Sequence, residues 1–304
     1  MMWSIMTLLG LASAALVTQP HARLVFVRHG ESVWNEQNLF TGWADVELSE
    51  RGVDEAKAGG AELKKAGLKF DVAFTSMLQR AKNTCAIAIE QCEQAGLPII
   101  EDYRLNERHY GALQGKNKKE TVAKYGEAQV KAWRRSYDIP PPPVQAGSEH
   151  DPRVDPMYMD IDPACLPTCE CLKDTVERCL PLWDEQIAPA LVAGQTVLVA
   201  AHGNSIRGLV KYLDQISQDE ITSVEIPTGI PLVYDLDATL TPIPSTGAIA
   251  PLSGTFLGDA AAIADAQAKV AQQTAATPSS EGVRENIEAV LPLRVHGLTR
   301  DEAK

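Results

Sequence analysis

Two stretches of this sequence share one pattern, in which a run of apolar residues stops abruptly at a histidine followed by a glycine. The first is a Leu-Val-Phe-Val run that leads through Arg28 to His29, and the second occupies residues 196–201 and leads to His202. Such partly β-branched runs predict strands that are buried on both faces of a parallel sheet. Ligands of open α/β sheets bind beyond the carboxyl ends of the strands. Two such strands can therefore place two imidazoles in one pocket, whereas a single histidine after a strand would indicate little.

Strands and helices alternate along most of the chain. Ser49 is placed to cap a helix that runs to about Ala66, where Gly67 would end it. Apolar periodicity and turn residues predict the other elements, which are strands over 70–75 and 231–235 and helices over 78–95, 173–193 and 204–215. This alternation predicts an α/β fold of three layers, with a mostly parallel central sheet flanked by helices.

Arg80 falls in the first turn of the helix predicted over 78–95. A cation at that place opposes the helix macrodipole at a cost of about 0.3–1 kcal/mol. Two interpretations follow. Arg80 is either an ordinary solvated side chain, or a ligand whose guanidinium shares an anion with the N–H groups of the helix N-terminus.

Residues 104–167 differ in composition from the rest of the chain. Nine lysines and arginines crowd the first half of this segment, and four consecutive prolines follow at 140–143. A proline run of this kind is a stiff polyproline segment, so we expect a helical and irregular cap inserted over the sheet. The positive charges form either a solvated face or, beside two candidate active-site histidines, a surface that binds anions.

An Arg-His pair, a second histidine, an isolated arginine and a basic cap together favour phosphoryl transfer without a metal. Positive side chains can neutralise phosphoryl oxygens as magnesium does in kinases. A neutral imidazole, whose ordinary pKa is about 6.5, is a competent nucleophile at neutral pH. The leaving alkoxide needs a proton donor, and the candidate is Glu107. The structural alternative for Glu107 is a salt bridge to Arg104 or Arg108.

The overall charge of the chain restricts its possible binding partners. A formal net charge of −12 argues against general binding of nucleic acids or anionic membranes.

Residues 1–22 form a hydrophobic extension whose apolar runs are shorter than the roughly 20 residues that span a bilayer. Ala-Ser-Ala at 12–14 resembles a signal-peptidase site, but the usual basic start is missing. The extension is therefore a cleaved targeting segment, a disordered extension or the product of a wrongly chosen start codon. The polar tail over 277–304 is expected to be loosely held.

The chain has six cysteines, and four of them lie between 165 and 179. Their spacing does not match C-x-x-C and no histidine is near, so no metal site is predicted. Disulfides become possible in this cluster if the chain enters an oxidising compartment.

Several motifs, in their order along the chain, resemble the cofactor-dependent phosphoglycerate mutases of the histidine phosphatase superfamily. The resemblance implies one mutase domain over about 23–276 with the cap insertion at about 104–167. Lys116 departs from the family pattern, which has an apolar residue there, as do Cys171 in place of serine and Phe256 in place of tyrosine. The matching blocks are Arg28-His29-Gly30-Glu31-Ser32, Phe40-Thr41-Gly42-Trp43, residues 104–111, Trp133-Arg134-Arg135-Ser136-Tyr137, Ala201-His202-Gly203-Asn204-Ser205 and Ile226-Pro227-Thr228-Gly229.

The resemblance also implies a reaction and a set of site residues. The enzyme would be an isomerase that interconverts 3-phosphoglycerate and 2-phosphoglycerate through a phosphohistidine, primed by 2,3-bisphosphoglycerate and without a metal. His29 would be the nucleophile and Glu107 the general acid and base. The phosphate pocket would be completed by Arg28, Arg80, His202, Asn35 and the backbone of Gly203. The rest of the substrate would be held by Thr41, Gly42, Tyr110, Lys118, Arg134, Arg135 and Asn204.

Two alternatives stay open. The first is a bisphosphoglycerate mutase and phosphatase of the same family. That branch is expected to have a Cys-Ser pair where this chain has Thr41-Gly42, so the sequence favours the phosphoglycerate mutase. A non-catalytic sensor or scaffold would keep the fold without the reaction. The resemblance further implies small phosphoglycerates as partners, no nucleic acid, no stable membrane association, and a homo-oligomer, either a dimer or a tetramer. The location would be cytoplasmic by family default, unless residues 1–20 direct the chain to an organelle or the secretory route.

Overall fold

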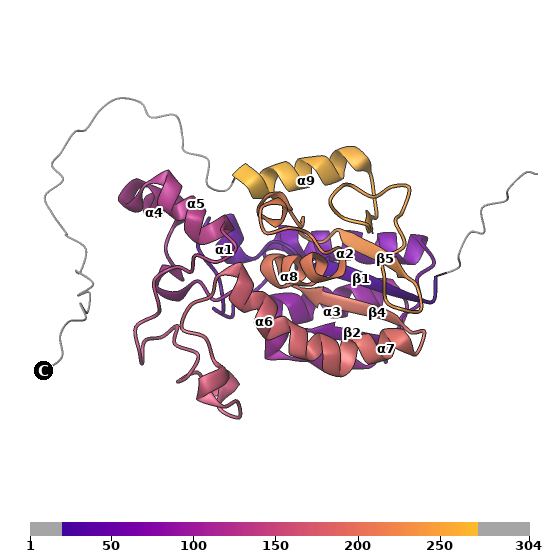
Figure 1. The fold of residues 1–304 in the computed structure, drawn as a ribbon, viewed down its shortest axis with the longest axis horizontal. Coiled ribbons are helices and arrows are strands. Elements are labelled where there is room, and N and C mark those ends of the chain that lie inside the picture. The colour runs from indigo at the N-terminus through magenta and orange to yellow at the C-terminus, as the bar shows by residue number, and fades with distance from the viewer. Residues whose placement is uncertain (1–19, 273–304) are drawn as a thin grey trace, which may run out of the picture.

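A computed structural model describes residues 20–272 of the chain as a six-stranded sheet covered by helices on both faces (Figure 1). The strand order is β3-β2-β4-β1-β5-β6. The first four of these pair in parallel, while β5 is antiparallel to β1 and β6 is antiparallel to β5. The prediction of a mostly parallel sheet is therefore confirmed. The strands are β1 (Ala22–Arg28), β2 (Val72–Thr75), β3 (Ile99–Glu101), β4 (Thr196–Ala201), β5 (Pro231–Leu236) and β6 (Thr255–Phe256).

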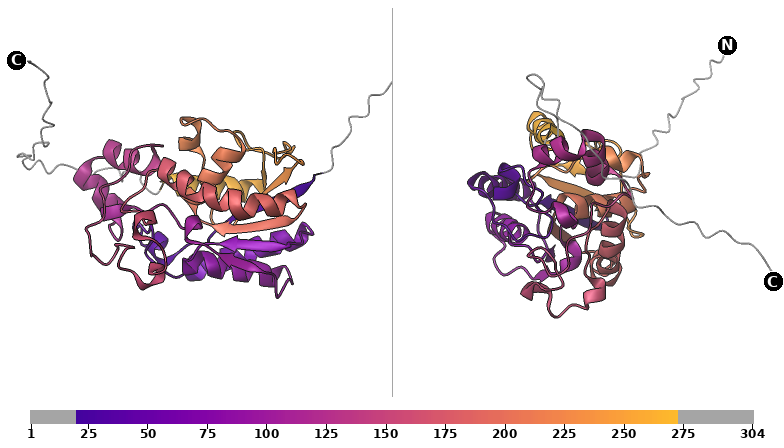
Figure 2. Two further views of the ribbon diagram at one scale, coloured as in Figure 1. Left: turned by 60° about the horizontal axis from the view of Figure 1, so that its bottom comes forward. Right: turned by 90° about the vertical axis from the view of Figure 1, so that its left-hand side faces the viewer.

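The apolar run of β1 is buried because the sheet has a hydrophobic core on each side. Leu24 and Phe26 belong to one core cluster, and Val25 and Val27 belong to the other. The second cluster lies under α2 (Glu50–Lys65) and α3 (Gln79–Gln91), and the first lies under α6 (Leu172–Leu182), α7 (Ala188–Val192) and α8 (Gly203–Leu213). Figure 2 shows these two groups of helices on opposite sides of the sheet. The three predicted layers are thus confirmed.

The helix α2 has the predicted ends, whereas α3 is shorter than predicted. Ser49 Oγ accepts a hydrogen bond from Gly52 N (3.1 Å) at the start of α2, and Gly67 after its end has a φ of +67°. The predicted helix over 78–95 stops at Gln91, and that prediction was wrong by four residues. One reason is local, because Glu93 takes a left-handed φ of 57°, and the other is a distant contact, because the Gln94 side chain bonds to the backbone of Phe70, two residues before β2.

The helix predicted over 173–193 is interrupted by one π-helical turn. Trp183–Ile187 form this turn between α6 and α7. Pro189 has no N–H to donate to the carbonyl four residues earlier, so the regular α-helical ladder cannot run through this point. The helix predicted over 204–215 is α8, and the strand predicted over 231–235 is β5, which runs one residue further.

The cap insertion consists of short helices and irregular chain, as predicted. Its helices α4 (Lys118–Tyr125) and α5 (Glu127–Arg135) lie beside α1 (Val33–Glu36) at one end of the molecule (Figure 1). A small hydrophobic cluster of Phe40, Leu113, Val130 and Trp133 holds α5 to the body of the fold. The last described helix is α9 (Ala260–Gln272).

Other predictions concern the cysteines and the chain ends. All six cysteines are free thiols, and the residues that the structure describes contain no group of three or more metal-ligating side chains. No helix between residues 20 and 272 is both long enough and apolar enough to span a bilayer. The predictions for residues 1–19 and for the tail over 277–304 lie outside the described residues.

Candidate active site

The sheet topology brings the two histidines of the repeated pattern together. The strands β1 and β4 are parallel neighbours, and His29 N donates to Ala201 O (2.9 Å) where they end. The two imidazole rings, of His29 and His202, lie with centroids 4.9 Å apart at an angle of 60°. Both residues are buried, with exposed fractions of 3% and 0%. The structure thus brings the two imidazoles of the repeated pattern into contact.

The hydrogen bonds of His29 leave one ring nitrogen suited to nucleophilic attack. Its Nδ1 lies 2.6 Å from Gly30 O, which can only accept, so Nδ1 carries the proton and Nε2 carries the lone pair. Arg80 Nε donates toward Nε2 at 3.4 Å. On the neighbouring ring, Nε2 of His202 is hydrogen-bonded to Ser76 Oγ (2.7 Å).

Burial and positive neighbours keep both histidines neutral. Burial lowers the pKa of His29 well below its usual value, and the charges of Arg80 and Arg28 lower it further. The pKa of His202 is also lowered well below its usual value by burial, then by Arg80 and His29. The pKa values fall because protonation would add a positive charge to a buried site that already holds two arginines. His29 is therefore unprotonated at neutral pH.

Arg80 is a buried site residue, so its interpretation as a solvated side chain was wrong. It is 0% exposed, and its guanidinium donates to Gly42 O (2.7 Å) and Ala44 O (2.9 Å) while its Nε faces His29. Burial lowers the pKa of Arg80 to about 10, and Glu107 opposes this shift. The guanidinium thus remains charged at neutral pH and lies against the nucleophile.

A cavity of about 70 Å³ lies above His29, and nearly all of the predicted site residues line it. His202 is the exception, because it packs against the ring of His29. Lys116 is exposed on the surface and does not line this cavity. The predicted residues that line the cavity are Arg28, His29, Asn35, Thr41, Gly42, Arg80, Glu107, Tyr110, Lys118, Arg134, Arg135, Gly203 and Asn204.

Several buried polar atoms of these residues bond to no other protein atom. Within residues 20–272 they include Arg28 Nε and Thr41 Oγ1 in the cavity wall and Nδ1 of His202. Burial lowers the pKa of Lys118, and Arg134 and Arg28 lower it further, while burial lowers the pKa of Arg134 to about 10. Buried donors and crowded cations are costly unless an anion compensates them. The wall of the cavity therefore suits an anionic ligand.

Glu107 faces this cavity from the cap, and its contacts differ from the salt bridge considered for it. Its Oε1 accepts from Asn204 Nδ2 (2.8 Å) and from Arg108 N (2.7 Å). Arg104 instead pairs with Asp102 and Glu185, at 2.8 and 2.7 Å. The carboxyl group of Glu107 is thus held in the site by Asn204, which comes from the start of α8.

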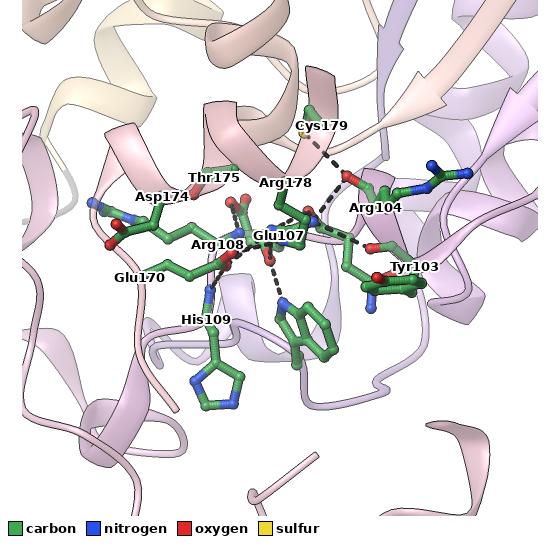
Figure 3. A network of polar contacts seen from close by, with 12 residues as sticks. Tyr103, Arg104, Glu107, Arg108, His109, Glu170, Asp174, Thr175, Arg178 and Cys179 are labelled. Carbon is green, nitrogen blue, oxygen red and sulfur yellow. Dashed lines mark hydrogen bonds and ion pairs between the residues drawn. The ribbon is translucent and has the colours of Figure 1, made fainter. Parts of the chain in front are cut away.

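An arginine that the sequence analysis missed holds the loop that carries Glu107. Arg178, on α6, donates to the backbone carbonyls of residues 103, 104, 106 and 107 and pairs with Glu170 at 2.6 Å (Figure 3). Glu170 Oε2 in turn accepts from His109 N (2.7 Å). Trp43 Nε1 adds a bond to Glu107 O (2.6 Å). The Arg178 guanidinium, the Glu170 carboxylate and the Trp43 indole thus fix the chain that follows the short 3₁₀ helix Tyr103–Leu105.

Two further charged residues of the cavity were also missed. Arg207, one helical turn after Asn204, donates to Asn204 Oδ1 (3.0 Å) and so orients its amide NH₂ toward Glu107. The i, i+3 spacing on α8 is a signal that could have found it. Glu225 lines the cavity and pairs with Arg135 at 2.6 Å, and nothing in the local sequence singles it out.

Comparisons with known proteins agree with this fold. The sequence model of the histidine phosphatase superfamily (branch 1) matches residues 24–165. The fold is similar to mycobacterial glucosyl-3-phosphoglycerate phosphatase, solved with VO3, at 25% identity and a TM-score of 0.54, over 70% of this chain and 92% of that one. It is also similar to YhfR of Bacillus stearothermophilus, at 22% identity and a TM-score of 0.56, over 75% of this chain and 98% of that one.

The two solved structures agree with the fold described above. The superfamily is a group of phosphotransferases and phosphatases that act through a phosphohistidine. The family match covers residues 24–165, the part of the chain that holds His29, Arg80 and Glu107.

Proposed function

We propose that this protein is a phosphoglycerate mutase that interconverts 3-phosphoglycerate and 2-phosphoglycerate through a phosphohistidine on His29, primed by 2,3-bisphosphoglycerate. One observation carries the proposal: a neutral, buried imidazole whose Nε2 carries the lone pair lies in a cavity where the buried Arg28 Nε and Thr41 Oγ1 have no protein partner. A substrate with a phosphate and a carboxylate needs two cationic subsites. Arg28 and Arg80 supply the first beside His29, and Lys118 and Arg134 supply the second under the cap.

The proposed reaction uses the geometry in two steps. In the first step, phosphorylated His29 passes its phosphoryl group to the free hydroxyl of 3-phosphoglycerate: Glu107 removes the proton of that hydroxyl, a P–O bond forms and the N–P bond breaks. In the second step, Nε2 of the freed His29 attacks the phosphorus at the 3-position, an N–P bond forms as that P–O bond breaks, and the leaving oxygen takes the proton back from Glu107. Arg28 and Arg80 neutralise the phosphoryl oxygens during both transfers. When bound, 2,3-bisphosphoglycerate supplies the phosphoryl group that first loads His29, and the cavity residues named above would hold it.

The second candidate is a phosphatase, in which water accepts the phosphoryl group from His29. The mycobacterial glucosyl-3-phosphoglycerate phosphatase at 25% identity supports it, and a bisphosphoglycerate mutase and phosphatase would act in the same way. Incubation of the purified chain with 3-phosphoglycerate, followed by phosphorus NMR, distinguishes the candidates. We expect 2-phosphoglycerate to form, faster with added bisphosphate. Release of inorganic phosphate without 2-phosphoglycerate would refute the mutase and support the phosphatase.

Chelators are expected to leave the activity unchanged. The site is built from arginines, lysines and histidines, whose charges can replace a divalent cation at the phosphoryl oxygens. The measurement is the mutase rate after dialysis against EDTA, with and without added manganese. A loss of rate in EDTA that manganese restores would contradict the proposed chemistry.

Arg134→Ala is expected to raise the KM and to release bisphosphate early, so that phosphatase activity rises relative to mutase activity. Arg134 is 7% exposed and lines the cavity at the end of α5. Loss of one charge-assisted contact costs about 1.5–3 kcal/mol, which is about ten- to a hundredfold in binding. Lys116→Leu is the control, because Lys116 is exposed and its charge is screened. If the ratio of the two activities stayed the same in Arg134→Ala, the residue would have no part in holding the substrate.

A further inference from the structure

The cavity wall contains an ion pair that the proposed reaction does not use. Arg135, at the end of α5 in the cap, donates from NH2 to Glu225 Oε1 at 2.6 Å. The two side chains are 17% and 15% exposed, so they lie at the rim, whereas His29 is 3% exposed. Glu225 comes from the body of the fold, just before the chain that leads into β5. Its backbone carbonyl also accepts from Gln267 on α9 (3.3 Å).

Glu225 is an unusual residue for a cavity that suits anions. The carboxylates that line the cavity are Glu107 and Glu225, among six lysine and arginine side chains. Glu107 is bound by Asn204 and has a place in the reaction. Glu225 has no such place, and its negative charge repels any anionic group that enters its end of the cavity.

We propose that Glu225 is a specificity-determining residue, whose carboxylate competes with the second anionic group of a substrate for the guanidinium of Arg135. The proposal deepens the proposed function, because it concerns a ligand with two anionic groups in this same cavity. It predicts that Glu225 weakens the binding of bisphosphorylated ligands far more than the binding of a single phosphate beside His29.

The physical reason is an exchange of partners. A guanidinium that turns toward the ligand must first leave a carboxylate at 2.6 Å, and that carboxylate is then left beside the negative ligand. The charge of Glu225 also acts on Arg134 and Arg207, whose pKa values it raises against the lowering by burial. An uncharged residue at position 225 removes the competition and leaves Arg135 available. A single phosphate beside His29 would be less affected, because Arg80 faces His29 directly whereas Glu225 lies at the rim.

The test is equilibrium binding to the full chain by calorimetry, with 2,3-bisphosphoglycerate and inorganic phosphate as the two probes. We expect Glu225→Gln to bind the bisphosphate about tenfold more tightly than the wild type, and phosphate with less than about a twofold change. Glu55→Gln is the matched control. Glu55 pairs with Arg51 at 3.0 Å and is 18% exposed, but it does not line this cavity. The control should bind both probes as the wild type does.

A second variant separates competition from a structural role. In an Arg135→Gln background, the gain from Glu225→Gln should be smaller than in the wild-type background, because no guanidinium is released and only the direct repulsion between the carboxylate and the ligand is removed. If Glu225 only docks the cap, Glu225→Gln would weaken both probes equally or leave both unchanged, and either result would overturn the proposal. Binding needs no turnover, so the outcome is distinct from the fate of the proposed function. A chain without mutase activity can still show the predicted difference between the two probes.

Discussion

His29→Ala is expected to abolish turnover and the acid-labile phosphorylation of the protein. The His29 imidazole offers Nε2 to the cavity because Nδ1 donates to Gly30 O at 2.6 Å. Burial and Arg80 lower its pKa, so the lone pair is available at neutral pH. Without it no covalent intermediate can form, and a loss on the order of 10⁴-fold or more in rate is expected, as for other enzymes that lose their nucleophile. The measurement is mass spectrometry of the protein after incubation with 2,3-bisphosphoglycerate, together with the steady-state rate.

The same labelling experiment identifies the phosphorylated histidine. His150→Ala is the control, since His150 lies outside the cavity and its loss should leave the label unchanged. Phosphate on His202 instead of His29 would contradict the assignment, although the rings lie only 4.9 Å apart. That outcome is unexpected because His202 does not line the cavity and its Nε2 lies 2.7 Å from Ser76 Oγ.

Glu107→Gln is expected to slow phosphoryl transfer by about 10²- to 10⁴-fold while the KM stays near its wild-type value. Glutamine keeps a side-chain oxygen that can accept from Asn204 Nδ2 and Arg108 N, so the loop should keep its position. What the substitution removes is a proton that can move to and from the substrate oxygen. Single-turnover measurement of His29 dephosphorylation by phosphoglycerate reports this step directly.

The control for Glu107→Gln is again Glu55→Gln. Glu55 Oε2 also accepts a backbone N–H, from Glu31 at 2.8 Å, but it lies outside the cavity. Equal rates in the control and the wild type would show that removing a half-buried carboxylate is harmless elsewhere in the fold. A wild-type rate in Glu107→Gln would mean that Glu107 serves only to hold the loop.

Local sequence was enough to predict the elements that carry the nucleophile. An uninterrupted apolar run is removed from water only when both faces of its strand are buried. The sheet does this for the run before His29, because it buries Leu24 and Val25 in opposite cores. Ser49 and Gly67 set the ends of α2 because capping depends on a few neighbouring residues. The end of α3 was missed, since the Gln94 side chain bonds to Phe70, twenty-four residues earlier in the chain.

Tertiary structure alone decided how the site is completed. Arg178 on α6 supports the Glu107 loop in the cap, seventy-one residues away, and Glu225 meets Arg135 from ninety residues further along the chain. Neither pair has a local signature, because an arginine on a helix or a glutamate in a loop is as often solvated as bound. The sequence by itself determined the α/β sheet and the two histidines at its strand ends, since burial and strand direction follow from short-range patterns. Which charges surround those histidines depends on how distant segments pack, and packing is a property of the whole fold.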